Sequence, residues 1–208
     1  MSNTENTGGK SPKEMEEIKG AVNDTSAKIY PIIKPADWVG IRAGALKTNM
    51  IGSPAENNLK LVVAYGKDTP DNLVFLTQND LPKYEGRNII EEALQNIDEY
   101  PTEFEYFEAF ENRALSASGP DFASERILSQ SHMLKAHEML EAEELIVSIP
   151  RRSCMMVIAR DASEDLLNKF AYLHDYTWND DSYGNAPISN LLFIVKEGSI
   201  VAHINLED

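Results

Sequence analysis

Two adjacent arginines, Arg151 and Arg152, are the residues whose chemistry stands out most clearly in this sequence. They form the only adjacent pair of cationic residues in the chain, and they lie in a turn between two short segments rich in β-forming residues. A guanidinium held at the end of a hairpin can form two parallel hydrogen bonds with a carboxylate or a phosphate. The turn is therefore the best candidate for a contact with a ligand or a partner. The alternative is an internal ion pair, with Asp121 or Asp161 as the acidic partner.

A second candidate site requires the fold to bring three distant side chains together. Asp121, Ser124 and Arg152 combine a carboxylate, a hydroxyl and a guanidinium, which a small-molecule pocket or a hydrolase can use. Convergence of these side chains on one cavity would favour this interpretation, and their dispersal would remove it.

The single cysteine, Cys154, begins an apolar segment. Burial raises the pKa of a thiol, and nearby cations lower it. Because the two arginines are close in sequence, Cys154 can be either an inert or a reactive thiol. The sequence contains no Gly-Xaa-Ser-Xaa-Gly, no phosphate-binding P-loop and no Gly-Xaa-Gly-Xaa-Xaa-Gly. We therefore assign no catalytic residue and expect no cofactor.

The histidines do not have the spacing of a metal site. His132 and His137 are five residues apart, which directs them about 140° away from each other on one helix. We expect both on a helix surface and predict no metal site. A calcium loop starting at Asp180 lacks the glutamate required at its twelfth position, where Leu191 stands. His174 falls on an apolar stripe, which is typical of a histidine in the core.

The charge of the chain limits its partners. In 208 residues, 34 Asp and Glu outnumber 19 Lys and Arg, and the formal net charge is -15. Such a surface repels a phosphate backbone, so we expect no nucleic-acid partner, whereas a basic protein partner fits. The alternative is that the acidity serves only solubility. Within 102–111, acidic and aromatic residues interleave, which indicates either a half-buried strand or an acidic and aromatic patch for a cationic partner.

The chain has no apolar run approaching the roughly 20 residues of a membrane span, and its first residues do not have the pattern of a signal peptide. One cysteine also excludes an intrachain disulfide. These features predict a cytoplasmic protein without a membrane partner, and they carry no information on its oligomeric state.

The elements that must position these residues alternate between hairpins and helices. The pattern predicts hairpins at 59–77, 144–160 and 191–204, a helix at 89–97, helical structure at 122–140 with a break at 129–131, and a helix after 161. Asn88 and Asp161 are the expected helix caps. Tyr176, Trp178 and Tyr183 indicate that the loop after the last helix either recognises a ligand or packs onto the domain. The order favours an α+β fold, with a largely antiparallel sheet built from hairpins and helices packed on one face.

The chain divides near residue 29. Residues 1–28 predict a mobile tail with a possible short helix that ends at about Val22, because the first ten residues cannot bury anything and a capping box follows them. Continuous apolar patterning starts later, so 29–208 is expected to form a single α+β domain.

A series of different short motifs follows along this domain. They are Leu61-Val62-Val63-Ala64-Tyr65, Asp68, Pro70-Asp71, Phe75-Leu76-Thr77, Asp80-Leu81, Ala93-Leu94, Asn96, Asp121-Phe122-Ala123-Ser124, Ile127-Leu128, Ile146-Val147-Ser148-Ile149-Pro150, Arg152, Pro187-Ile188-Ser189 and Gly198. In this order they resemble the YtpQ-like family of bacterial proteins, a domain of unknown function. The resemblance implies an α+β bacterial cytoplasmic protein and implies no reaction. The chain departs from the family pattern at Ser153, where relatives are expected to carry an acid, so a role for an Arg–Asp pair at this turn does not carry over.

The leading interpretation is a non-enzymatic protein that binds or regulates another protein, for example an acidic inhibitor of a basic toxin or nuclease. The negative charge, the acidic and aromatic segment and the lack of catalytic motifs support it. The alternative is a small-molecule-binding protein or a hydrolase with a pocket near Asp121, Ser124 and Arg152.

Overall fold

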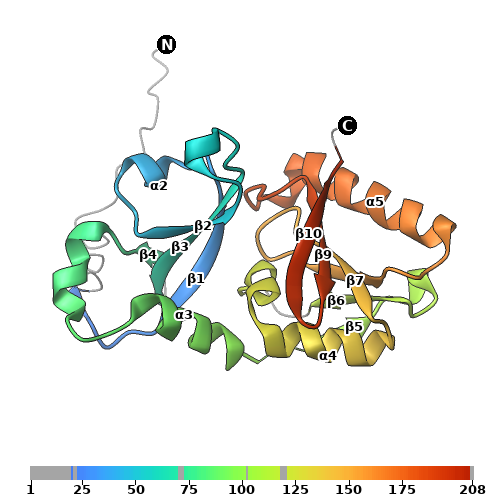
Figure 1. Ribbon diagram of the computed structural model, residues 1–208, viewed down its shortest axis with the longest axis horizontal. Helices are drawn as coiled ribbons and strands as arrows, with labels where there is room; N and C mark the ends of the chain where they lie inside the picture. Colours follow the sequence, from blue (N-terminus) through green and yellow to red (C-terminus); the bar gives the residue numbers. More distant parts are fainter. Residues whose placement is uncertain (1–19, 21–22, 70–72, 102, 118–120, 207–208) are drawn as a thin grey trace, which may run out of the picture.

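The computed structural model describes residues 20, 23–69, 73–101, 103–117 and 121–206. The predicted tail up to residue 19, with most of its short helix, lies outside these ranges. The described chain contains two antiparallel sheets that lie side by side, each with its own helices (Figure 1). The predicted α+β class is therefore confirmed.

The first sheet is built around a central buried strand. Its strands are β1 (Ile29–Pro35), β2 (Lys47–Ile51), β3 (Leu61–Asp68) and β4 (Leu73–Phe75). β3 pairs with the other three strands, all antiparallel, and is buried along almost its whole length. The predicted hairpin at 59–77 corresponds to β3 and β4. Helices α2 (Val39–Arg42) and α3 (Ile89–Asp98) and two 3-10 helices (Pro54–Glu56 and Gln78–Tyr84) complete this part.

The second sheet has six strands in the order β10-β9-β7-β8-β6-β5. They are β5 (Phe104–Tyr106), β6 (Ala114–Ala117), β7 (Glu144–Ser148), β8 (Met156–Ala159), β9 (Leu191–Lys196) and β10 (Ser199–Asn205). β7 pairs with β8, and β9 pairs with β10, so both predicted hairpins in this region are confirmed. The helices are α4 (Gln130–Leu140), α5 (Glu164–Asn179) and three 3-10 helices (Glu108–Phe110, Ser124–Leu128 and Asp181–Tyr183).

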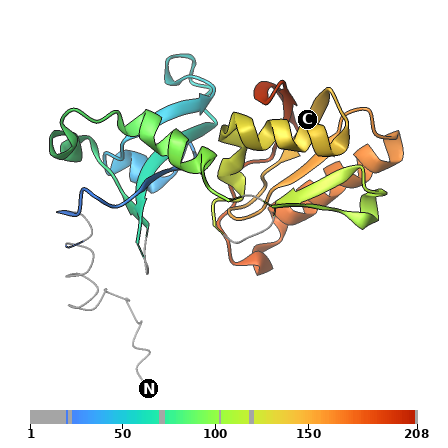
Figure 2. The same cartoon turned by 90° about the horizontal axis from the view of Figure 1, so that it is seen from below.

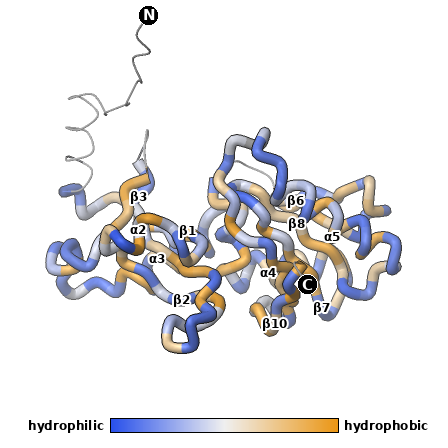
Figure 3. Tube along the Cα trace, turned by 90° about the horizontal axis from the view of Figure 1, so that it is seen from above, coloured by the Kyte–Doolittle hydropathy of each residue, from blue (hydrophilic) through white to orange (hydrophobic). Residues whose placement is uncertain are grey.

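Helices cover both faces of the second sheet, and this differs from the prediction of helices on one face. Leu145 and Val147 of β7 pack in one hydrophobic cluster with Met133 of α4, whereas Ile146 packs in another cluster with Phe170 of α5. Successive strand residues point to opposite faces, so β7 must be apolar throughout. Figure 2 shows α4 and α5 on opposite sides of the sheet, and Figure 3 shows the hydrophobic residues gathered along the strands.

Side-chain caps begin the main helices. Asn88 accepts a hydrogen bond from the Glu91 amide at the start of α3, as predicted. Ser129 caps α4 and separates it from the preceding 3-10 helix, which confirms the predicted break. The cap of α5 is Ser163 and not Asp161 as predicted, because the chain turns for three residues after β8 before the helix begins.

The two sheets share part of their core. Ile33 of β1 and Leu61 of β3 belong to the same hydrophobic cluster as residues of β7, β8 and β9. Hydrogen bonds also cross the junction: the Ser129 hydroxyl donates to Asp98 (2.6 Å), and the His132 imidazole lies 3.0 Å from the Ile97 carbonyl oxygen. No helix in the described ranges is both long enough and apolar enough to cross a membrane.

Candidate functional site

Arg151 is an internal anchor. Its side chain is almost fully buried, and its guanidinium donates hydrogen bonds to the carbonyl oxygens of Thr177 (2.7 Å), Trp178 (2.6 Å) and Asn185 (2.8 Å). It also pairs with the exposed carboxylate of Asp181 at 3.1 Å. The arginine therefore fastens the end of α5 and the loop after it. The internal ion pair is made with Asp181 and not with Asp121 or Asp161, the partners expected from the sequence.

Arg152 is exposed, and its charge acts on the junction of the sheets. Burial raises the pKa of Asp68, the exposed Asp121 adds to this rise, and Arg152 opposes it. Asp121 and Arg152 therefore lie in one electrostatic neighbourhood, near the end of β3.

Ser124 lies in the interior, where it supports a carboxylate that the sequence analysis did not single out. Ser124 is fully buried, and its hydroxyl donates to Glu125 (3.0 Å). The same carboxylate accepts a hydrogen bond from the Ile33 amide across the junction (3.2 Å). Burial raises the pKa of Glu125, while these hydrogen bonds and the charge of Arg152 lower it. With its hydroxyl used in this way, Ser124 is not placed to attack a substrate.

The surroundings of Cys154 favour the inert thiol. Burial raises the pKa of this thiol, and burial is the one cause of the shift among the described residues. Arg151 is directed instead at the carbonyl groups of α5 and the loop, as described above. Nucleophilic chemistry by Cys154 is therefore unfavourable.

Two of the histidines, His132 and His174, are buried and serve packing. His132 is buried against α3, and not on the helix surface as predicted, because α4 contacts α3 as well as the second sheet. His174 is fully buried on the apolar side of α5 as predicted, with the Ser148 hydroxyl 2.8 Å from its Nδ1. Burial lowers the pKa of His174 to about 4. Across the described residues, no group of three or more His, Cys, Asp or Glu side chains is placed to hold a metal ion.

The acidic and aromatic segment 102–111 buries most of its aromatic side chains. Phe104 and Phe110 are buried in the core clusters, and Phe107 packs against one of them. Tyr106 is exposed, with its hydroxyl bound to the Met139 carbonyl (2.8 Å). The half-buried strand is therefore the better description of β5.

An acidic and aromatic surface occurs instead on the outer side of α5. Tyr172 and Tyr176 are 71% and 52% exposed, and their rings stack with centroids 6.4 Å apart. Three nearby polar residues, Asp175, Asn179 and Asp180, complete a surface that we call the tyrosine face. Tyr176 was noted in the sequence, whereas Tyr172 was missed. Tyr172 precedes Tyr176 by four residues and lies on the side of the helix opposite the apolar stripe. This spacing could have identified it from the sequence. The side chain of Tyr183 lies outside the described part.

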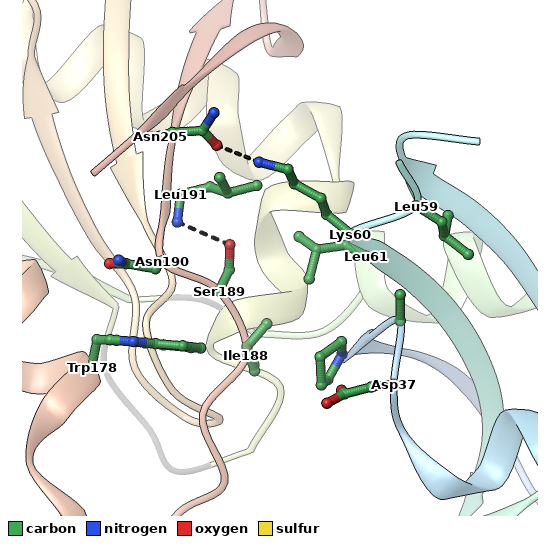
Figure 4. A pocket seen from close by; sticks show the side chains of 12 residues that line it. Asp37, Leu59, Lys60, Leu61, Trp178, Ile188, Ser189, Asn190, Leu191 and Asn205 are labelled. Atoms are coloured by element: carbon green, nitrogen blue, oxygen red, sulfur yellow. Dashed lines mark hydrogen bonds between the residues drawn. The ribbon is translucent and has the colours of Figure 1, made fainter. Parts of the chain in front are cut away.

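A pocket of about 350 Å³ lies between the two sheets (Figure 4). Asp37, in the turn after β1, and Lys60, just before β3, line it from the first half of the molecule. Trp178 of α5 and Ile188 and Asn190 of the loop before β9 line it from the second half. Arg151, Arg152, Asp121 and Ser124 are not among its lining residues.

No protein-family model matches the chain, and no curated protein or solved structure is significantly similar to it. The resemblance to the YtpQ-like family therefore stays a prediction, and the function must be argued from the geometry.

Proposed function

We propose that this protein is a non-enzymatic binding protein that holds a basic, arginine-containing segment of a protein partner on the tyrosine face of α5. The observation that carries the proposal is the pair of exposed, stacked rings of Tyr172 and Tyr176. Neighbouring exposed aromatic rings on one helix offer flat apolar surface, and aromatic side chains exposed in this way are typical of interfaces.

The charge around these rings selects a cationic partner. Asp175 and Asp180 lie beside them, and hydrogen bonds from Ser182 hold the pKa of Asp180 below its ordinary value. The cation on the same helix, Lys169, is directed away: it donates to the Ala109 carbonyl (2.6 Å) and lies over the Phe110 ring. The face is therefore acidic, in a chain whose net charge is -15.

The helix itself adds to this negative potential. Carbonyl groups at a helix C-terminus carry partial negative charge, which disfavours acidic side chains there. The last turn of α5 has no basic residue, and Asp180 and Asp181 follow it. Arg151 relieves only part of this repulsion. A guanidinium placed over Tyr172 or Tyr176 would relieve more of it while making a cation–π contact.

A regulatory role follows from such a site. A protein that covers a basic segment blocks the contacts of that segment with nucleic acid or with other acidic molecules. An inhibitor of a basic toxin or nuclease is one concrete form of this function.

The proposal can be tested with a ten-residue peptide of alternating arginine and glycine, titrated against the labelled protein and followed by NMR. We expect shifts confined to the tyrosine face. The double variant Tyr172→Ala/Tyr176→Ala should bind about five- to thirty-fold more weakly, since each exposed cation–π contact contributes about 0.5–1 kcal/mol. A lysine peptide should bind more weakly than the arginine peptide because ammonium groups stack less well on aromatic rings.

Tyr106→Ala is the matched control, because Tyr106 is also exposed beside an acidic residue, Glu105. It should leave the affinity unchanged. Equal weakening by the control and the double variant, or shifts centred on β5, would show that only the general acidity of the protein attracts the peptide.

A further inference from the structure

The pocket between the sheets has an apolar floor that belongs to the core. Leu61, Ile188 and Leu191 are buried and form part of the hydrophobic cluster that the two sheets share. The half-buried Trp178 adds an aromatic wall, and Figure 4 shows its ring extending toward Ile188. A ligand with apolar side chains would therefore be held by surface from both halves of the molecule.

Two opposite charges lie at the rim of this pocket. In Figure 4, Lys60 extends across the gap toward Asn205, and Asp37 lies on the other side of the pocket, facing the loop that carries Ile188. Both side chains are exposed, and neither forms an ion pair with the other or with any further residue in the described ranges.

The contact of Lys60 leaves it free to bind an anion. Its ammonium donates to the amide oxygen of Asn205 (2.5 Å), which is neutral and comes from the other sheet. An ammonium group has three donors, so two remain for a carboxylate. The bridge to Asn205 also fixes where this carboxylate would sit, above the apolar floor.

We propose that this pocket binds a short zwitterionic peptide of two or three residues with apolar side chains. Its terminal carboxylate pairs with Lys60, its terminal ammonium pairs with Asp37, and its side chains lie against Trp178 and Ile188. A free amino acid carries both charges on a single carbon atom, whereas Lys60 and Asp37 lie on different sides of the pocket, so we expect a dipeptide or tripeptide to pair with both more readily. Lys60 occupies the side-chain oxygen of Asn205, which leaves the amide N–H groups of this residue for a carbonyl of the peptide backbone, and the amide group of Asn190 also lines the pocket.

Calorimetry with leucyl-leucine and its blocked forms tests the assignment. We expect binding to the free peptide, and about five- to ten-fold weaker binding after amidation of the C-terminus or acetylation of the N-terminus, as expected for loss of one charged hydrogen bond at an exposed site. Glycyl-glycine, which has both charges and no apolar side chains, should bind at least as weakly as these. Free leucine should also bind more weakly than the dipeptide.

Substitutions in the pocket test where each terminus of the bound peptide lies. Lys60→Met should weaken the free peptide and leave the affinity of the amidated peptide unchanged, and Asp37→Asn should behave in the same way toward the acetylated peptide. Lys47→Met is the matched control, because the Lys47 ammonium also donates to an asparagine side chain, that of Asn49 at 3.0 Å, outside the pocket. It should change nothing. Absence of binding at millimolar peptide, equal affinity for the blocked peptides, or equal affinity for free leucine would overturn the proposal.

Discussion

The guanidinium of Arg151 donates hydrogen bonds to three backbone carbonyl groups, those of Thr177, Trp178 and Asn185. Replacing it with alanine leaves these acceptors unpaired in a poorly hydrated site, which is a costly outcome for buried polar groups. We expect Arg151→Ala to lower the free energy of unfolding by at least about 3 kcal/mol, measured by urea denaturation, since each buried acceptor left unpaired costs about 1–3 kcal/mol. Arg160→Ala is the control, since the pair of Arg160 with Glu144 is exposed, and it should cost under about 1 kcal/mol. Similar losses for both variants would contradict an anchoring role.

Glu125 makes stability depend on pH in a direction opposite to that of a paired surface carboxylate. Burial raises its pKa in the folded state above the ordinary value of 4.5. The stability that this group contributes is therefore complete below about pH 4.5 and is lost as the pH rises through the raised pKa. The glutamine of the variant Glu125→Gln cannot ionise. We therefore expect the free energy of unfolding of the variant minus that of the original protein to increase as the pH rises from 4 to 8.

Denaturation curves at several pH values measure this difference. A constant offset between the variant and the original protein would show that Glu125 ionises in the folded state as readily as in water. Glu138→Gln, on the exposed side of α4, is the control and should leave the pH dependence unchanged.

For single residues, the sequence identified important side chains better than it identified their hydrogen-bond partners. It drew attention to Arg151, yet three of its acceptors are backbone carbonyls 26 to 34 residues away. Any residue can supply a carbonyl, so no sequence pattern marks them. Glu125 was missed for a related reason: its role comes from the Ile33 amide, 92 residues away, and only the packing of the sheets brings the two together.

Among the elements, the turn between β9 and β10 touches helix α4. Glu197 and Gly198 both have positive φ, 50° and 75°, as in the tight turns that match the twist of a hairpin. A Cβ atom at Gly198 would lie 2.7 Å from Gln130 Cγ and 2.9 Å from the Gln130 carbonyl oxygen. The glycine is therefore required both by its backbone conformation and by the close approach of α4.

A pair of alanine substitutions separates these two effects. Gly86 has φ 81° and open space around its Cβ position, so Gly86→Ala should cost only the backbone strain, about 1 kcal/mol. Gly198→Ala adds the clash with Gln130, and we expect it to cost at least about 2–3 kcal/mol in chemical denaturation. Equal costs would mean that the hairpin moves away from α4 without loss.

Local elements could be predicted because their signals are local. The three hairpins, the Asn88 cap and the break at Ser129 depend on residues a few positions apart. The order of the strands does not: β7 lies between β8 and β9, and the latter is more than 40 residues further along the chain. The division into two sheets was missed because both halves have the same alternation of hairpin and helix.

For the whole molecule, the important feature is that one hydrophobic cluster belongs to both sheets. Ile33 and Leu61 enter the cluster from the first sheet, and hydrogen bonds from Ser129 and His132 reach α3 from the second. If either sheet unfolded alone, the other would expose these groups to water. The proposed peptide pocket lies on the same junction, so its geometry depends on both sheets being folded.

We therefore expect the two sheets to unfold together, as the single domain predicted at 29–208 requires. The two tryptophans report on different halves: Trp38 packs on Phe75 beside the first sheet, with ring centroids 4.5 Å apart, and Trp178 ends α5 beside the second. Trp38→Phe leaves only the second reporter, and Trp178→Phe leaves only the first. In each variant, the midpoint from tryptophan fluorescence should coincide with that from circular dichroism, which follows both halves. Different unfolding midpoints for the two halves would show two independent domains. The junction would then be a contact between domains and not a common core.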